Sequence, residues 1–133
     1  MSRYAEVYKS WTDNPEQFWA DAAKDISWYK LWDKVIDPYS GHYGRWFVGA
    51  ECNTAYNCLD RHVEAGRGAQ KALIYDSPVT GTQRTYTYDE LTTEVATLAA
   101  VLLDLGVGKG DRVLIYMPMI AESVIAMLAC ARI

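Results

Sequence analysis

Two side chains with metal-binding and nucleophilic chemistry, Cys58 and His62, lie four residues apart, a spacing that places both on one face of a helix. A structural zinc site needs four ligands, and a catalytic one needs three and a water molecule. Cys52 is the one further candidate nearby, and its spacing is not that of a zinc knuckle. A thiolate activated by an imidazole would also need a third group to orient the base, and none is evident. We therefore predict neither a metal site nor a nucleophile and base pair at these residues, and interpret His62, beside Asp60 and Arg61, as a surface or hydrogen-bonded structural residue.

The glycine-rich run Gly106–Gly110 invites comparison with a phosphate-binding loop. Such a loop follows a strand and opens a helix, so that backbone N–H groups and the helix dipole face the phosphate. Here a helix pattern precedes the run, a strand pattern follows it, and Lys109 is followed by Gly110 where a P-loop has serine or threonine. This order favours a plain turn between a helix and a strand.

Aromatic side chains are concentrated at the start of the chain. Stacked aromatic rings can bind a sugar or a peptide. They can also anchor an irregular arm, because the burial of large side chains offsets the entropy lost when the arm is ordered. We favour the anchoring role and keep a carbohydrate-binding surface as the alternative. All the tryptophans belong to this region: Trp11, Trp19, Trp28, Trp32 and Trp46.

Composition narrows the class of protein. The 133 residues are half hydrophobic with interspersed charges, which is typical of one domain with or without an arm. The net charge is −4 without a run of Lys or Arg, so we expect no nucleic-acid partner. The first residues do not resemble a signal peptide, and the apolar region 113–133 is broken by Pro118 and Glu122, so we expect no membrane span. Three cysteines without a CxxC motif favour a reduced, cytoplasmic chain.

Capping signals outline the helices of the first half. Asn14 can cap a helix that has Pro15 at its first position, and Asn53 can cap a second helix that Gly66 ends. Residues 27–46 show no sustained period and contain the turn signals Asp37-Pro38 and Ser40-Gly41. The sequence therefore predicts an irregular arm between two helices.

The second half has clearer periods. Strand-like runs at 72–75 and 84–86 flank a polar turn and predict a hairpin. Thr87 and Glu90 match a capping box that opens a helix over 88–105. The run Val113–Met117 lacks alternation, which is typical of a strand covered on both faces.

The last predicted helix, from Ile120 onward, decides the expected fold class. Ile120, Val124, Met127 and Ala131 make an apolar face, and no glycine, asparagine or proline is present to cap the final carbonyls. The order helix, strand, helix predicts an α/β fold that begins a doubly wound parallel sheet and lacks the next strand. We therefore expect a fragment that exposes an apolar C-terminal helix, through which copies could associate.

Several strings along the chain are familiar in combination. They are Arg45-Trp46-Phe47, Tyr56 to His62, Arg84 to Leu91, Lys109 to Val113, Ile115 to Met119 and Ala126 to Ile133. Together they resemble the N-terminal region of the AMP-forming acetyl-CoA and propionyl-CoA synthetases, which belong to the adenylate-forming superfamily. Ala50 and Cys52 depart from the glycine and leucine usual in that family. Residues 72–82, following His62 to Gly68, are more similar to the propionyl-CoA branch.

The resemblance implies two regions. Residues 1–66 would be an aromatic-rich helical arm or cap, and residues 67–133 would be the truncated start of the large AMP-binding domain. It implies a whole enzyme that uses ATP and Mg²⁺ to convert propionate or acetate into an acyl-adenylate with release of pyrophosphate, and then transfers the acyl group to CoA with release of AMP.

In that family the phosphate-binding loop, the ribose-binding aspartate and the lid lysine all follow the segment that resembles Ile133. We therefore assign no catalytic, ATP-, CoA- or Mg²⁺-binding residue to this chain. The chain alone is expected to be inactive and to bind none of these ligands tightly. The alternative function is a free-standing interaction module, derived from such a synthetase, that docks on a partner.

Overall fold

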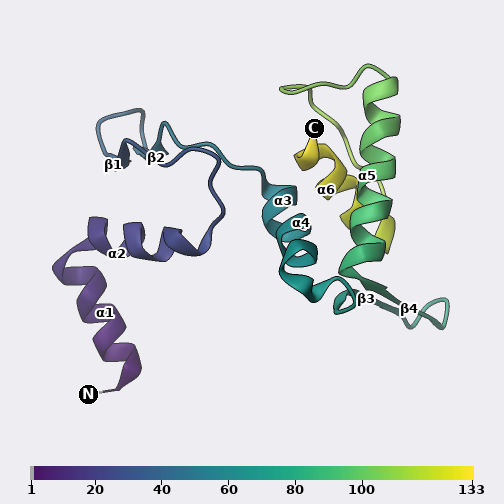
Figure 1. Ribbon diagram of the computed structural model, residues 1–133, viewed down its shortest axis with the longest axis horizontal. Coiled ribbons are helices and arrows are strands. Elements are labelled where there is room, and N and C mark those ends of the chain that lie inside the picture. Colours follow the sequence, from purple (N-terminus) through teal and green to yellow (C-terminus); the bar gives the residue numbers. More distant parts are fainter. Residues whose placement is uncertain (1) are drawn as a thin grey trace. The chain divides into compact units, whose positions relative to one another are not determined.

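The computed structural model describes residues 2–133, and the chain divides into two compact units between Cys52 and Asn53 (Figure 1). Helices and short antiparallel strand pairs are present in both units, in agreement with the predicted α/β class. Within the described range, no helix has the length and apolar character required to cross a bilayer. The boundary predicted at residue 66, between an arm and a larger domain, stays a prediction.

Two helices open the first unit, α1 (Arg3–Asp13) and α2 (Pro15–Ala22), and a 3-10 turn, η1 (Ala23–Asp25), follows them. The predicted cap of α2 is confirmed, because the Asn14 side chain accepts a hydrogen bond of 3.1 Å from the Gln17 amide. Helix α1 was not predicted, although Tyr4, Tyr8 and Trp11 recur at helical spacing along it. All three of these side chains are exposed.

The predicted irregular arm contains an antiparallel strand pair, β1 (Lys34–Asp37) and β2 (Arg45–Val48), in which Ile36 lies opposite Trp46. Strands of four residues are too short to show a clear alternation, so the sequence revealed only the turn signals that lie between them. Gly49 follows β2 with φ of +79°, and a Cβ atom there would collide with the Asp33 carboxylate. The positive φ of this position after β2 therefore favours glycine.

Aromatic rings pack against one another in this unit. The Trp28 ring lies 5.5 Å from that of Trp32 and 5.4 Å from that of Phe47, and the Trp32 and Phe47 rings are 5.1 Å apart. The indole Nε1 of Trp28 also donates a 2.8 Å hydrogen bond to the carbonyl of Ala23. The rings thus hold the hairpin and the preceding turn together, which supports an anchoring role for these three residues.

The second unit starts with a helical segment in three parts: α3 (Thr54–Cys58), α4 (Asp60–His62) and the π-helical turn η2 (Val63–Arg67). The predicted beginning at Asn53 is confirmed, and Gly66 leaves the helical conformation with φ of +76°, as expected of the residue that ends it. One continuous helix was predicted, but the backbone breaks at Leu59, whose φ and ψ are −126° and −76°. The Leu59 side chain is 1% exposed.

The predicted hairpin and the helix after it are confirmed. Strands β3 (Lys71–Ser77) and β4 (Thr82–Thr87) pair in antiparallel fashion, and α5 (Tyr88–Asp104) follows directly. Thr87 and Glu90 form the capping box, because the Glu90 amide donates to the Thr87 hydroxyl (3.2 Å) and the Thr87 amide donates to the Glu90 carboxylate (2.8 Å). This box satisfies two backbone N–H groups at the start of α5.

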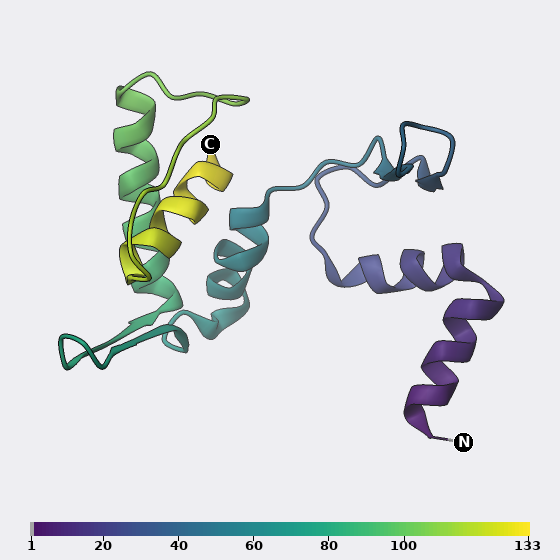
Figure 2. The ribbon, with the colours of Figure 1, turned by 180° about the vertical axis from the view of Figure 1, so that it is seen from behind.

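The predicted strand Val113–Met117 is not formed within residues 2–133. The segment connects α5 to α6 without regular structure, and no backbone hydrogen bond joins it to another described residue (Figure 2). A strand requires a neighbour to satisfy its N–H and C=O groups, and the two described sheets, β1–β2 and β3–β4, do not include this segment. The larger sheet is therefore incomplete, as expected, but its first strand is open to solvent where both faces were predicted to be covered.

Helix α6 (Ala121–Arg132) packs against α5 and α3. Three of its buried side chains, Ala121, Ile125 and Ala129, recur every four residues, and the two alanines allow close approach to α5. The predicted apolar face lies on the other side, where Met127 is 63% exposed. The cluster of buried residues at the core of this unit is Leu59, Tyr86, Leu91, Val95, Ala99, Ala121, Ile125 and Ala129.

We predict that Leu59→Ala destabilises the second unit by about 2–5 kcal/mol, because it leaves a cavity where a fully buried side chain packs. Urea unfolding followed by circular dichroism would measure the loss, since all tryptophans lie in the first unit. Leu103→Ala is the matched control, because Leu103 is 55% exposed. Its effect should stay within about 0.5 kcal/mol. Equal losses in the two variants would contradict the assignment of Leu59 to the core.

Candidate functional site

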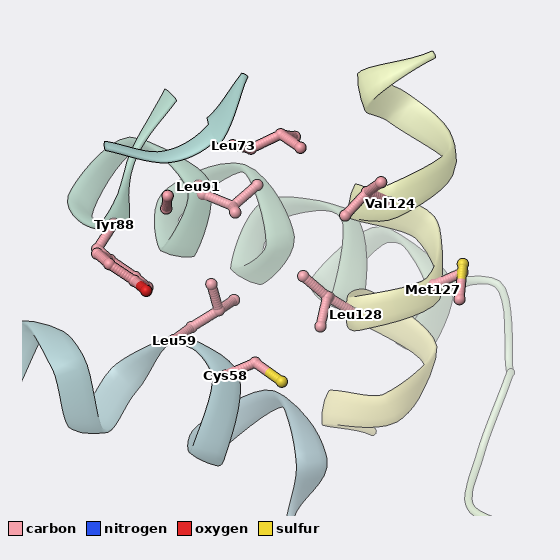
Figure 3. Close-up of a pocket in the computed structure, with 9 residues that line it drawn as sticks. Cys58, Leu59, Leu73, Tyr88, Leu91, Val124, Met127 and Leu128 are labelled. Atoms are coloured by element: carbon pink, nitrogen blue, oxygen red, sulfur yellow. The ribbon is translucent and has the colours of Figure 1, made fainter. Parts of the chain in front are cut away.

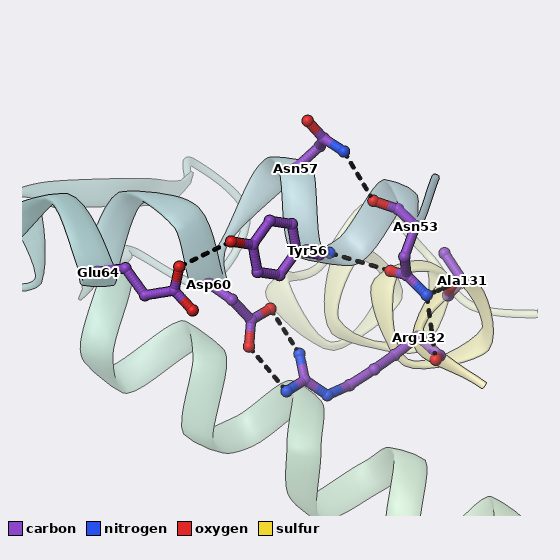
Figure 4. Close-up of polar contacts among 7 residues, drawn as sticks. All are labelled: Asn53, Tyr56, Asn57, Asp60, Glu64, Ala131 and Arg132. Carbon is purple, nitrogen blue, oxygen red and sulfur yellow. Dashed lines mark hydrogen bonds and ion pairs between the residues drawn. The ribbon is translucent and has the colours of Figure 1, made fainter. Parts of the chain in front are cut away.

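The densest polar contacts of the second unit join the beginning of α3 to the end of α6 (Figure 4). The Asn53 side chain forms hydrogen bonds with the ends of two helices. Its side-chain oxygen accepts from the Tyr56 amide at 3.0 Å, which caps α3. Its side-chain nitrogen donates to the carbonyls of Ala131 (3.1 Å) and Arg132 (3.3 Å), which are among the last of α6. The prediction that the final carbonyls of this helix lack a cap is therefore wrong, because the donor comes from a residue far away in sequence.

An ion pair lies beside this cap. Both terminal nitrogens of Arg132 bind the Asp60 carboxylate, at 2.7 and 2.8 Å, and the side chains are 31% and 20% exposed. Hydrogen bonds from the Arg132 guanidinium hold the pKa of the Asp60 carboxyl below its usual 3.8, although burial acts in the opposite direction. A two-pronged contact of this kind fixes orientation as well as distance. We call Asn53, Asp60, Arg132 and the two capped carbonyls the polar joint.

Neighbouring side chains brace the polar joint. The Asn57 side chain donates to the Asn53 carbonyl at 3.0 Å, and the Tyr56 hydroxyl donates to Glu64 at 2.7 Å. Each acidic or amide group named here has a partner within the joint or its braces. The arrangement therefore suits a structural connection and offers no unpaired nucleophile or base.

An apolar cavity of about 330 Å³ lies between α3, β3, α5 and α6 (Figure 3). Figure 3 shows Leu59, Leu73 and Leu128 directed toward its centre, with the Cys58 thiol beside them. Among the side chains that line the cavity, only those of Cys58 and Tyr88 carry a polar hydrogen, on a thiol and a hydroxyl group. The other side chains are aliphatic or, at Met127, a thioether. The residues that line it are Cys58, Leu59, Ala72, Leu73, Tyr88, Leu91, Val124, Met127 and Leu128.

A second hollow, of about 490 Å³, lies between the hairpin turn and the residues that precede α6. Its lining spans Tyr75 to Thr80 and Pro118 to Ile120, and Asp76 is its one ionisable acid. Stabilisation of a polyphosphate requires cations and backbone N–H donors directed at one point. Neither cavity is lined by lysine or arginine. These two cavities therefore lack the cationic lining that ATP or the phosphates of CoA would need.

The glycine-rich run at Gly106–Gly110 also lacks the geometry of a phosphate loop. It follows α5, and Gly106 and Gly110 have φ of +87° and +98°. The Gly108 amide donates to the Asp111 carboxylate at 2.8 Å, so an acidic side chain occupies the place of a bound anion. The run is a turn, as predicted, although it leads into an unpaired segment and not into a formed strand.

Cys58 and His62 do not come together in a metal or catalytic arrangement. Among residues 2–133 no group of three His, Cys, Asp or Glu side chains is placed to hold a metal ion, and Cys52 belongs to the other unit. His62 contacts the Arg67 guanidinium, and its ring lies 4.8 Å from that of Tyr88. Burial lowers the pKa of His62, and the charges of Arg67 and Arg61 lower it further. Both effects favour the neutral imidazole.

Sequence reasoning missed the polar joint. The sequence predicted Asn53 only as the cap of α3. Asp60 and Arg132 were noted only as part of the segments that resemble the synthetase family. The available signals were the uncapped end of α6 and the isolated charge of Arg132 on that helix, but nothing in the sequence paired residues more than 70 positions apart.

Comparisons with known proteins agree along the whole described chain. Residues 4–58 match the family model described as acetyl-coenzyme A synthetase N-terminus, and residues 59–133 match that of the AMP-binding enzymes. The chain is 48% identical over 132 residues to human acyl-CoA synthetase short-chain family member 3, mitochondrial, covering 99% of this chain and 19% of that protein. It is also 48% identical over 132 residues to acetyl-coenzyme A synthetase of Deinococcus radiodurans, of which it covers 20%.

A solved structure is similar as well. Acetoacetyl-CoA synthetase from Streptomyces lividans superposes with a TM-score of 0.84 and 32% identity, covering 98% of this chain and 20% of that one. The chain thus spans about a fifth of the length of the relatives that it matches.

We predict that the contribution of Asp60 to stability is lost in acid. Because its folded pKa is lowered, the stabilisation is complete above pH 3.8 and disappears as the pH falls through the folded value. The free energy of unfolding of Asp60→Asn, compared with that of the unaltered chain, should show a difference at pH 7 that shrinks below pH 3.8. In an Arg132→Met background the same substitution should show no such pH dependence. A difference that does not shrink as the pH falls below 3.8, or that is unchanged by Arg132→Met, would contradict the pairing.

Asn53→Asp separates the two functions of Asn53. The carboxylate can still accept from the Tyr56 amide, but it cannot donate to the carbonyls of Ala131 and Arg132. We expect a loss of about 1–3 kcal/mol in urea unfolding, because two carbonyls then face an acceptor.

Asn14→Asp is the matched control for this substitution, because Asn14 only accepts a hydrogen bond at its helix end and aspartate is an equally good cap. Its effect should stay within about 0.5 kcal/mol. A neutral result for Asn53→Asp would show that the donor function is dispensable.

Proposed function

The chain belongs to the family of AMP-binding enzymes, and we propose that it forms the N-terminal region of a short-chain acyl-CoA synthetase. One observation carries the proposal. An acetyl-CoA synthetase N-terminal match and an AMP-binding match follow each other without a gap from residue 4 to residue 133. The coverage of about a fifth of each relative supports the assignment to a part of such an enzyme.

The whole protein, on this proposal, joins a short carboxylate to CoA at the expense of ATP. The carboxylate attacks the α-phosphate of Mg²⁺-bound ATP and expels pyrophosphate. The CoA thiol then attacks the acyl carbonyl and expels AMP. Both steps develop charge that needs cationic and N–H groups around it, and the two cavities described above are not lined by lysine or arginine. The chemistry is therefore assigned to other parts of the enzyme.

This region contributes by holding helices α3 and α6 in place relative to each other. The two family matches meet between residues 58 and 59, within the segment that carries the polar joint. Asn53 lies in the first match, and Asp60 and Arg132 lie in the second. The joint therefore connects the end of the first match to helix α6 in the second match. It keeps α3 and α6 in a fixed orientation.

We propose propionate as the acyl substrate, with acetate as the close competitor. The support is the string at residues 72–82, which forms most of the β3–β4 hairpin. The identities to relatives do not discriminate, because relatives named for short-chain acyl-CoA and for acetyl-CoA synthesis are both 48% identical. A cytoplasmic location remains part of the same proposal.

A free-standing interaction module is the second candidate. The observation in its favour is the exposure of large apolar side chains in the second unit, among them Leu114 at 90% and Met127 at 63%. A module of this kind would bind an intact synthetase in a fixed ratio, whereas a region that belongs within the enzyme would find its place already filled.

We predict that a chimera restores carboxylate-dependent exchange of pyrophosphate into ATP. In it, this chain replaces the matching 132 residues of the Deinococcus acetyl-coenzyme A synthetase. The exchange rate should fall within about tenfold of the parent, because the chemistry resides in the retained part. The 133-residue chain alone should give only the blank rate.

Arg132→Met in the chimera should lower the exchange rate, whereas Val79→Ser, at a position that is 93% exposed, should not. Exchange catalysed by the chain alone would overturn the assignment of chemistry to the rest of the enzyme. A folded but inactive chimera would contradict the proposed function. Stoichiometric binding of the chain to the intact parent would favour the interaction module.

A further inference from the structure

The π-helical turn η2 is closed by two side chains of the chain itself. His62 is the residue immediately before this turn, and Arg67 is its last residue. The Arg67 guanidinium contacts Nδ1 of the His62 ring, so the contact spans the whole turn. Arginine has only donors, and Nδ1 therefore accepts and carries no proton. Turns of this kind are rare, and Gly66 within this one has φ of +76°, so regular helical geometry does not hold the turn by itself.

The His62 ring also contacts the next helix. The side chain is half-buried, and its ring lies 4.8 Å from that of Tyr88 with 55° between the two planes. Tyr88 is the first residue of α5. The imidazole therefore joins the end of η2, through Arg67, to the start of α5, through Tyr88.

The backbone that follows η2 supports the start of α5. The carbonyl of Gly68 accepts from the Asp89 amide, and the carbonyl of Gln70 accepts from the Tyr88 amide, each at 3.0 Å. The first amides of a helix have no partner within that helix, so these two depend on the loop. A Cβ atom at Gly68 would collide with the Asp89 carboxylate, which shows how closely the loop lies against α5. A change in the shape of η2 would therefore disturb the start of α5.

Protonation of the imidazole would add a positive charge beside two others. On its own segment Arg61 and Arg67 are both positive, and both lower the pKa of the ring, as burial does more strongly. Glu64, the acid of the same turn, accepts from a tyrosine hydroxyl of α3. On α5, Tyr88 presents a neutral phenol, and Asp89 holds its carboxylate against the loop that follows η2. The surroundings of the ring therefore favour its neutral form.

We propose that His62, Arg67 and Tyr88 form a pH-sensitive clamp on η2, which is closed while the imidazole is neutral and is opened by its protonation. A proton on Nδ1 removes the acceptor for Arg67 and places like charges side by side. The turn then loses the contact between its ends, and the loop that follows it is no longer held at the start of α5. The change is local, because the polar joint uses none of these side chains. The inference does not depend on the proposed enzymatic function.

The direction of the pH dependence follows from the lowered pKa of His62. In the open turn the ring takes up a proton more readily, because its pKa there approaches the usual 6.5. The clamp is therefore complete above pH 6.5 and is lost as the pH falls from 6.5 through the folded value. Between these two values, each pH unit raises the equilibrium constant for opening by about tenfold at most.

NMR of the histidine rings tests the clamp. The chain has two histidines, and His42→Gln identifies which signals belong to His62. Long-range nitrogen–proton correlation above pH 6.5 should show the tautomer with its proton on Nε2. Arg67→Met should raise the pKa of His62, because it removes both the donor and a nearby positive charge.

Arg84→Met is the matched control, because the Arg84 guanidinium lies over the Tyr86 ring, 4.3 Å from its centroid. It should leave the pKa of His62 unchanged. A neutral ring with its proton on Nδ1 would overturn the proposal, and so would the same His62 pKa in Arg67→Met as in the unaltered chain.

Hydrogen exchange measures the opening itself. The amides of Tyr88 and Asp89 donate to the loop after η2, so their protection, corrected for the intrinsic exchange rate at each pH, should fall as the pH is lowered from 6.5. Protection of the Val95 amide, within α5, should not follow the same pH dependence. In His62→Gln the protection of Tyr88 and Asp89 should no longer depend on pH in this range.

Three results would overturn the proposal. They are constant protection of Tyr88 and Asp89 across the titration of His62, an equal loss at Val95, and a pH dependence that persists in His62→Gln.

Discussion

The end of α6 sets the main constraint on the second unit, because the last carbonyls of a helix have no partner within that helix. Here the donor is the Asn53 side chain, whose oxygen also caps α3, so one amide group satisfies the ends of two helices. The Arg132 and Asp60 pair fixes the same approach from the side. With α6 held in this way, Ile125 and Ala129 meet the core formed by α5, and the apolar cavity forms between the helices.

Features that depend on residues close in sequence were predictable. The caps at Asn14, Asn53 and Thr87, the end at Gly66 and the β3–β4 hairpin each follow from a few neighbouring residues, and the structure confirms them. The failures have physical reasons. The break at Leu59 interrupts a pattern that is periodic in sequence, β1 and β2 are too short for a period, and the polar joint pairs residues that only tertiary packing brings together.

At the candidate site, too, local features could be predicted from the sequence and tertiary surroundings could not. The chemical types of Cys58 and His62 were evident in the sequence, but their surroundings were not. In the structure the Cys58 side chain lines an apolar cavity, and His62 contacts Arg67 and Tyr88. The Gly108 amide donates to the Asp111 carboxylate, so a carboxylate of the same loop takes the place that a bound phosphate would have. Polar groups that are fully hydrogen-bonded to one another make the local structure rigid. This accords with a positioning role for a region of an AMP-binding enzyme.

The distribution of apolar residues supports an interface beyond the described contacts. Half of the sequence is hydrophobic, yet small residues such as Ala121 and Ala129 occupy much of the inner face of α6, while Leu114, Tyr116 and Met127 lie outside. Scattered exposed hydrophobic residues are common in proteins, but an uncharged run with free backbone groups is not, because it leaves both apolar area and hydrogen-bonding groups exposed to association. In an enzyme about five times as long, more of the chain is available to cover such a run.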